Sequence, residues 1–144
     1  MHLFILSSQV VYPPTDGGKQ GIYYRMNALG GRVRVSVCMV NSADIVVEDG
    51  GFDDVYHSSI IPQILKPSIE CGRVELMHQT IHSFIRGLPR QALVTDSVRE
   101  RERLMAYIRE TQVTTVLLES PFVAPLLDLP QLREWNVKIV VVLH

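Results

Sequence analysis

The sequence predicts an α/β fold, in which a mainly parallel β-sheet lies between two layers of helices. Short apolar stretches typical of strands alternate along the 144 residues with stretches whose apolar residues recur at helical spacing. The last such strand, Val137–Leu143, is apolar on both faces apart from Lys138, which is typical of a central strand in a parallel sheet. The length fits one domain, and we expect residues 1–144 to form it.

Each element is predicted from its own local pattern. Alternate residues of Arg32–Val40 are valine or methionine, which indicates a strand buried on one face. Ser97 and Glu100 have capping-box spacing at the start of a helix over Ser97–Thr111, whose buried stripe should include Val98. The other predicted strands are His2–Leu6, Thr114–Leu118 and a third around Val55, and the other predicted helices are Lys19–Leu29, Val74–Ile85, a short one from Pro121 and another over Gln131–Trp135.

Composition excludes several classes of protein. The 14 basic and 15 acidic residues nearly balance, so the chain lacks the positive charge of a nucleic-acid-binding domain. Cys38 and Cys71 form no CxxC pair, so neither a zinc site nor a disulfide framework is indicated, and Cys38 is expected to be a small core residue. The first apolar run is too short for a signal peptide, and no window reaches about 20 apolar residues, so a cytoplasmic location is predicted.

Three polar features follow predicted strands. The Gly17-Gly18 turn closes the loop Ser7–Gly18, Glu119-Ser120 follows the strand TTVLL, and His144 follows the last strand. Ligands of open parallel sheets bind outside the carboxyl ends of the strands, so we expect a site at this edge. Two glycines at a helix start allow close approach of an anion, which the helix dipole favours, but a simple turn and cap at Asp16-Gly17-Gly18 is an equally open interpretation.

Common nucleotide-binding motifs do not match this turn. A Walker A loop requires Ser or Thr after Gly18-Lys19, where Gln20 stands, and Pro13 occupies the place of its first glycine. The dinucleotide fingerprint fails because Asp16 stands where its first glycine should be. His78 and His82 have metal-ligand spacing, but Gln79 replaces the glutamate of a zinc protease, so two solvated histidines are the favoured interpretation.

Two further segments carry charge. The run RERER at Arg99–Arg103 is expected to be a solvated helix face with pairing between successive turns. The segment Phe84–Arg90 mixes apolar and basic residues, which fits either a membrane contact or, as the favoured interpretation, a loop that packs on its own domain.

Five segments, in this order, carry a family resemblance: FILSSQVVYPPTDGGKQGIYYRMNALGG, RVRVSVCMVN, IRGLPRQALVTDS, TTVLLESPFVAPLLDLP and VKIVVVLH. Together they resemble the N-terminal half of a GT-B glycosyltransferase of family 4. The resemblance implies a Rossmann-like three-layer sandwich that forms the acceptor side of a cleft. A C-terminal domain, absent from this chain, would bind most of the nucleotide sugar, so the chain is expected to be truncated and inactive alone. The sequence departs from the pattern at Gly21, where the subgroup often has a basic residue.

The resemblance implies roles for the glycine turn and for His144, and the position of Glu119 at a strand end suggests a role for that residue. Gly17, Gly18 and Lys19 would approach the donor diphosphate. The remaining expected residues are His144 beside the donor sugar, Glu119 as an acceptor ligand or base, and Asp16 and Ser120 at the acceptor. No metal and no tightly bound cofactor are expected.

The implied activity is transfer of a sugar from a nucleotide sugar to a hydroxyl of a glycan or lipid-linked acceptor in cell-surface polysaccharide or glycolipid synthesis. Lipid-linked acceptors would place the enzyme peripherally at the inner face of a membrane, and the exposed domain interface would allow a dimer. Three alternatives remain open: a non-catalytic interaction module or split-transferase subunit, an unrelated Rossmann-like nucleotide binder, and a metal enzyme that uses His78 and His82.

Overall fold

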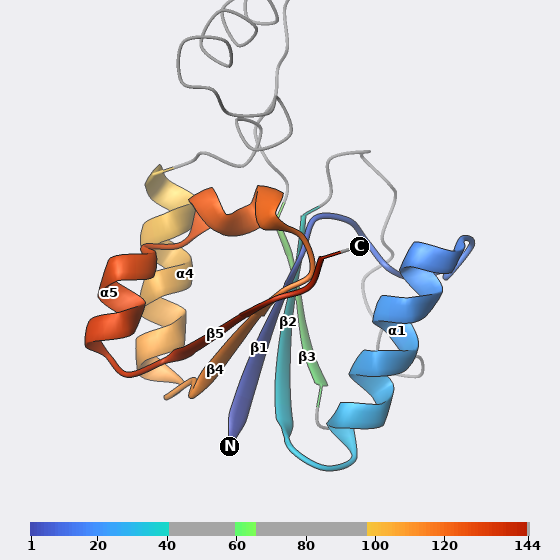
Figure 1. The fold of residues 1–144 in the computed structure, drawn as a ribbon, viewed down its shortest axis with the longest axis horizontal. Coiled ribbons are helices and arrows are strands. Elements are labelled where there is room, and N and C mark those ends of the chain that lie inside the picture. Colours follow the sequence, from blue (N-terminus) through green and yellow to red (C-terminus); the bar gives the residue numbers. More distant parts are fainter. Residues whose placement is uncertain (41–59, 66–97, 144) are drawn as a thin grey trace, which may run out of the picture.

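The fold is described from a computed structural model, which describes residues 1–40, 60–65 and 98–143 (Figure 1). Five strands of these residues form one sheet in the order β3-β2-β1-β4-β5, and every neighbouring pair is parallel. The predicted α/β class is therefore confirmed. The strands are β1 (His2–Ser7), β2 (Arg34–Val40), β3 (Ile60–Leu65), β4 (Thr115–Leu118) and β5 (Lys138–Val141).

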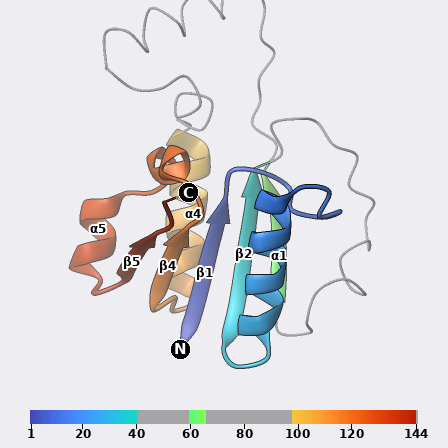
Figure 2. The ribbon, with the colours of Figure 1, turned by 45° about the vertical axis from the view of Figure 1, so that its right-hand side comes forward.

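Helices cover the two faces of the sheet and make three layers (Figures 1 and 2). One face carries α1 (Gly17–Gly30), whose buried side packs on β1 and β2. The other face carries the remaining helical elements of the described residues, which are α4 (Val98–Glu110), the 3-10 helix η1 (Pro121–Leu126) and α5 (Leu129–Glu134). This is the Rossmann-like three-layer arrangement.

In the part of the chain that the structure describes, the core consists of two clusters, one on each face of the sheet. In β1, Phe4 and Leu6 belong to the cluster under α4, and Leu3 and Ile5 belong to the cluster under α1. Successive side chains of a strand point to opposite faces, so a strand between two helical layers must be apolar on both. All six residues of β1 are accordingly buried.

The prediction that β2 is buried on one face was wrong. Six of its seven residues are buried, because α4 covers the face that carries Ser36, Cys38 and Val40. Cys38 is a fully buried core residue, as predicted. Ser36 is accommodated by hydrogen bonds, since its Oγ lies 2.7 Å from His2 Nε2 and 2.7 Å from the Tyr107 hydroxyl.

Two other strand predictions need correction. The last strand was expected to be central, but β5 lies at the edge of the sheet, and Val140 and Val141 are 45% and 44% exposed. The strand β3 at Ile60–Leu65 was not predicted, because Pro62 breaks the pattern there. A proline removes one donor and is tolerated at an edge, which is where β3 lies.

The helix predictions are largely confirmed. Pro121 does begin a short helix, and the helices predicted over 97–111 and 131–135 appear as α4 and α5 with slightly different ends. Val98 does not join the buried stripe of α4, since it is 63% exposed in the first turn, whereas Leu104, Met105 and Ile108 are buried. Within the described ranges, no helix is both long and apolar enough to cross a membrane.

Some predictions fall on residues outside the described ranges. They are the strand around Val55, the helix over Val74–Ile85, Cys71, the pair His78 and His82, the segment Phe84–Arg90, Ser97 of the capping box, and His144.

Candidate functional site

The site is built at the carboxyl edge of the sheet, around β1 and β4. Strands β2 and β3 lie on one side of β1, and strands β4 and β5 lie on its other side, so the chain order reverses between β1 and β4. Such a switch point leaves a crevice at the strand ends, where open α/β sheets bind ligands. The loop from β1 to α1 and the residues that follow β4 both lie at this edge.

Helix α1 begins at Gly17, two residues earlier than predicted, because Asp16 caps it. The Asp16 Oδ1 accepts a hydrogen bond of 2.9 Å from the Lys19 N–H, and the Asp16 carbonyl accepts the first helical bond from Gln20, also 2.9 Å. This is the usual N-cap geometry. The cap interpretation of Asp16-Gly17-Gly18 is thus confirmed, while an anion contact at the same turn stays a prediction.

The cap leaves the first two amides of the helix available. Among the described residues, no protein group accepts a hydrogen bond from the N–H of Gly17 or Gly18. A Cβ at Gly17 would have no heavy atom within 4 Å, whereas one at Gly18 would lie 3.3 Å from Asp16 Oδ1. Open space at Gly17 and two available N–H groups are what an approaching anion requires.

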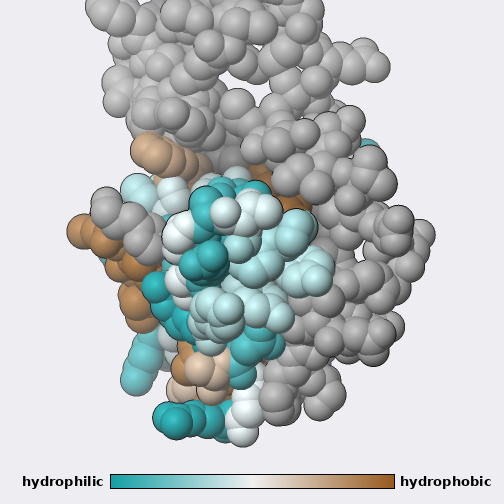
Figure 3. Space-filling view, turned by 90° about the vertical axis from the view of Figure 1, so that its right-hand side faces the viewer, coloured by the Kyte–Doolittle hydropathy of each residue, from teal (hydrophilic) through white to brown (hydrophobic). Residues whose placement is uncertain are grey.

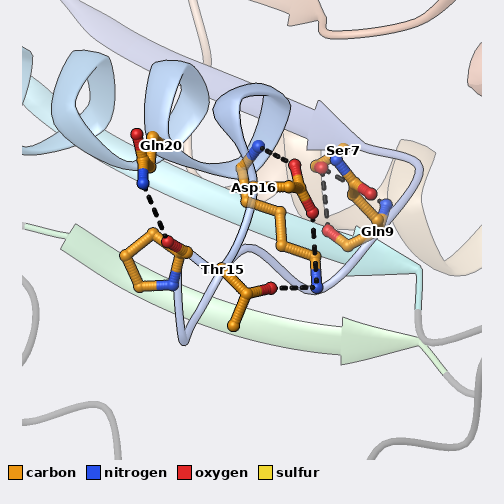
Figure 4. Close-up of polar contacts among 7 residues, drawn as sticks. Ser7, Gln9, Thr15, Asp16 and Gln20 are labelled. Carbon is orange, nitrogen blue, oxygen red and sulfur yellow. Dashed lines mark hydrogen bonds and ion pairs between the residues drawn. The ribbon is translucent and has the colours of Figure 1, made fainter.

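Polar contacts within the loop hold the start of α1 in place (Figure 4). Gln20 Nε2 donates to the Pro14 carbonyl at 3.3 Å, and Ser7 Oγ donates to the Gln9 carbonyl at 2.8 Å. Lys19 Nζ lies 3.4 Å from Thr15 Oγ1 and 3.9 Å from Asp16 Oδ2, and its side chain is only 17% exposed. The Lys19 side chain therefore lies against its own loop, and Nζ would have to give up its contacts with Thr15 and Asp16 before it could contact a ligand. Over the outer face of α1 the surface is mostly hydrophilic or neutral (Figure 3).

Glu119 lies directly after β4 and is buried, although it carries a carboxylate. Its side chain is fully buried, and its backbone N–H donates to the Leu6 carbonyl at the end of β1 at 3.0 Å. Arg25 of α1 reaches across to it, and Nη1 donates to both carboxylate oxygens at 2.6 Å. Burial of such a carboxylate is costly unless a charge-assisted partner is supplied, and Arg25 is that partner.

Arg25 is a site residue that the sequence analysis missed. The signal available was its position, since Arg25 follows Ile22 by three residues and precedes Met26, both of which are buried. A charge beside the apolar stripe of a helix needs a partner nearby. The partner lies 94 positions further along the chain, so no local pattern could have identified it.

Ser120 has a structural role at this edge. Its Oγ accepts a hydrogen bond of 3.2 Å from the Phe122 N–H and caps η1, as expected for a serine before Pro121. The structure thus brings Asp16, Gly17, Gly18, Glu119 and Ser120 to one edge of the sheet. Of the predicted residues, Lys19 lies there but is turned to its own loop, and His144 is outside the described residues.

A second hollow lies away from this edge. It is a groove of about 430 Å³ between α4 and α5, where the Arg109 guanidinium lies 5.7 Å from the centre of the Trp135 ring. It shares no residue with the strand-end site. In the part of the chain that the structure describes, no group of three or more His, Cys, Asp or Glu side chains could hold a metal ion.

Cys38 lies in the core and offers no reactive thiol. Burial raises its pKa from 9.0 to about 12, although the nearby Arg103 charge opposes the shift. The nucleophile in thiol chemistry is the thiolate, which is scarcely populated at neutral pH here.

Comparisons with known proteins find a likeness in fold but none in sequence family. No protein-family model and no curated protein matches the sequence. Among solved structures, the chain is similar to the C-terminal domain of a hydrogenase from Pyrococcus furiosus, with a TM-score of 0.50 and 14% identity over 99% of this chain and 90% of that one. At this identity the likeness concerns the fold alone, and it agrees with the Rossmann-like architecture.

Proposed function

We propose that the chain is the acceptor-side, N-terminal domain of a GT-B glycosyltransferase, which transfers a sugar from a nucleotide-sugar donor to a hydroxyl acceptor. The observation that carries the proposal is the start of α1. There, Gly17 and Gly18 offer two N–H groups at the carboxyl edge of a parallel sheet, beside its switch point, with open space over Gly17. The order and content of the five segments that resemble this family support the same assignment.

The chemistry follows from the charge that develops in the reaction. Cleavage of the donor's sugar–phosphate bond leaves negative charge on the diphosphate, and pre-aligned N–H groups at a helix start stabilise such charge. Gly17 and Gly18 would supply these groups, while a second domain holds the rest of the nucleotide. His144, which follows the last strand, would orient the donor sugar.

The ion pair with Arg25 favours a positioning role for Glu119. Both of its oxygens accept hydrogen bonds from Arg25 Nη1, and the side chain is fully buried, so action as a base would require release from the guanidinium. Asp16 is the more accessible carboxylate, since its side chain is 55% exposed. We therefore propose that Asp16 and Ser120 contact the acceptor, and that buried Glu119 makes no contact with it and has a positioning role.

The acceptor class and the location are taken from the resemblance. It suggests glycan or lipid-linked acceptors of cell-surface polysaccharide or glycolipid synthesis, handled by a peripheral enzyme at the cytoplasmic face of a membrane. A second candidate function is a non-catalytic module or split-transferase subunit. The outer edge of β5 favours it. Among the described residues β5 pairs with β4 alone, and an open strand edge beside exposed Val140 and Val141 can pair with another chain.

Two matched glycine substitutions test the proposal in the product of the complete gene, assayed with a panel of nucleotide sugars. Gly17→Ala places a methyl group where the diphosphate would approach, and Gly21→Ala places one in equally open space one turn further along. Gly17→Ala keeps the backbone N–H, but its methyl group would hold the diphosphate away from it. We therefore expect turnover to fall about a hundredfold, an effect comparable to the loss of one oxyanion donor, and to be unchanged in Gly21→Ala. Equal rates in the two variants, or no consumption of any donor by the wild type, would refute the transferase assignment.

A further inference from the structure

The two partners of the Arg25–Glu119 ion pair differ in their exposure to solvent. The Glu119 side chain is fully buried, whereas the Arg25 side chain is 34% exposed. Solvent therefore reaches the pair from the side of Arg25 and not from the side of Glu119. The pair is neutral as a whole, but its solvent-accessible partner carries the positive charge.

The hydrogen bonds of the pair occupy one nitrogen of the guanidinium. Nη1 donates to both Glu119 oxygens at 2.6 Å. Among the described residues, no protein group accepts a hydrogen bond from Nε or Nη2 of Arg25. These two nitrogens form one edge of the planar fork, whose parallel N–H groups match two oxygens of a phosphoryl or carboxylate group.

The pair lies at the edge of the sheet where open α/β folds generally bind their ligands. Arg25 extends from α1 to the residue after β4, where the Glu119 N–H is bonded to the Leu6 carbonyl of β1. These are the two strands between which the chain order reverses. A buried ion pair contributes little net stability compared with a well-packed apolar pair, so stability alone does not account for one at this place.

We propose that Arg25 is an anion-binding residue, whose Nε and Nη2 edge receives a phosphoryl group of a ligand bound at the β1–β4 edge. Glu119 is then a positioning residue that fixes the guanidinium. This inference rests on the proposed function in one respect: the phosphoryl group would belong to the donor diphosphate or to a phosphorylated acceptor.

Calorimetric titration of the 144-residue chain tests the proposal with two probes. Inorganic pyrophosphate represents a donor diphosphate, and glycerol phosphate represents a phosphate monoester on an acceptor. The double variant R25Q/E119Q replaces the ion pair by two amides that can bond to each other, and Arg25→Lys keeps the charge but removes the fork. Arg109→Gln is the control, since it removes a cation that lies over Trp135 on the opposite side of the sheet.

We expect the wild type and Arg109→Gln to bind at least one probe equally, and R25Q/E119Q to bind it about tenfold more weakly or worse, as expected for loss of a charge-assisted pair of hydrogen bonds. Arg25→Lys, which retains the partner for Glu119, should bind more weakly than the wild type even if the double variant does not fold. Loss confined to pyrophosphate would assign the donor, and loss confined to glycerol phosphate would assign the acceptor. Unchanged binding in folded R25Q/E119Q and in Arg25→Lys, or no binding of either probe by the wild type, would overturn the proposal.

Failure of this inference is separable from failure of the proposed function. Arg25-dependent binding of a probe, together with no sugar transfer by the complete gene product, would refute the transferase and leave the anion site in place. Sugar transfer whose rate and donor KM are unchanged in Arg25→Lys would support the transferase and refute the anion site at Arg25.

Discussion

The substitution Arg25→Gln should destabilise the fold strongly, because it leaves the fully buried Glu119 carboxylate without its guanidinium. Removal of one partner from a buried ion pair costs about 3–5 kcal/mol. Arg25 is one-third exposed, so water can reach that end of the pair, and we expect the lower value of about 3 kcal/mol. With a typical urea dependence of about 2 kcal/mol per molar, the unfolding midpoint should fall by about 1.5 M.

The assay is equilibrium urea unfolding of the 144-residue chain, followed by circular dichroism. Arg133→Gln is the matched control, because Arg133 is an exposed arginine of α5 for which the described residues show no ion pair. Surface substitutions of this kind change stability by about 0.5 kcal/mol or less, so the midpoint should hardly move. The double variant R25Q/E119Q should recover most of the loss. A midpoint in Arg25→Gln equal to that of Arg133→Gln would refute the view that the ion pair is buried and mutually dependent.

Three further predictions concern other parts of the molecule. Gly21→Ala should raise the free energy of unfolding by about 1 kcal/mol, since Gly21 lies inside α1 with nothing near its missing Cβ; an unchanged urea midpoint would contradict this. Between pH 9 and about 12 the unfolded chain loses the Cys38 proton that the folded chain keeps, because burial raises the pKa of this thiol. The wild type should therefore lose stability relative to Cys38→Ala as the pH rises through this window. Parallel curves of unfolding free energy against pH for the two proteins would contradict the raised pKa. The open edge of β5 predicts self-association at high concentration, and Val141→Lys should reduce it in analytical ultracentrifugation; a wild type that stays monomeric at every concentration would contradict the prediction.

The fold could be predicted where local pattern and final environment agree. Apolar residues at helical spacing located α1 and α4, and Pro121 marked the start of η1, because these signals act within a few residues. The strand β3 escaped prediction because Pro62 is tolerated only through its place at the sheet edge. The burial of both faces of β2 likewise depends on α4, which lies far along the sequence.

Part of the site could be predicted from the sequence, because the direction of parallel strands determines which residues share an edge of the sheet. Parallel strands bring their carboxyl ends to one edge, so the residue pattern alone could place the glycine turn and Glu119 together. The state of Glu119 could not be predicted, because it depends on Arg25, which comes from another element. Likewise, the contact of Lys19 with Thr15 and Asp16 depends on the exact path of the loop, which residue types alone do not determine.

The central claim is that the first amides of α1 receive a diphosphate, and nuclear magnetic resonance of the 15N-labelled chain tests it most directly. On titration with inorganic pyrophosphate, the amide protons of Gly17 and Gly18 should shift downfield as they form hydrogen bonds, while that of Gly21, one turn further into the helix, should hardly move. Pyrophosphate shifts elsewhere on the chain with Gly17 and Gly18 unmoved would contradict the account.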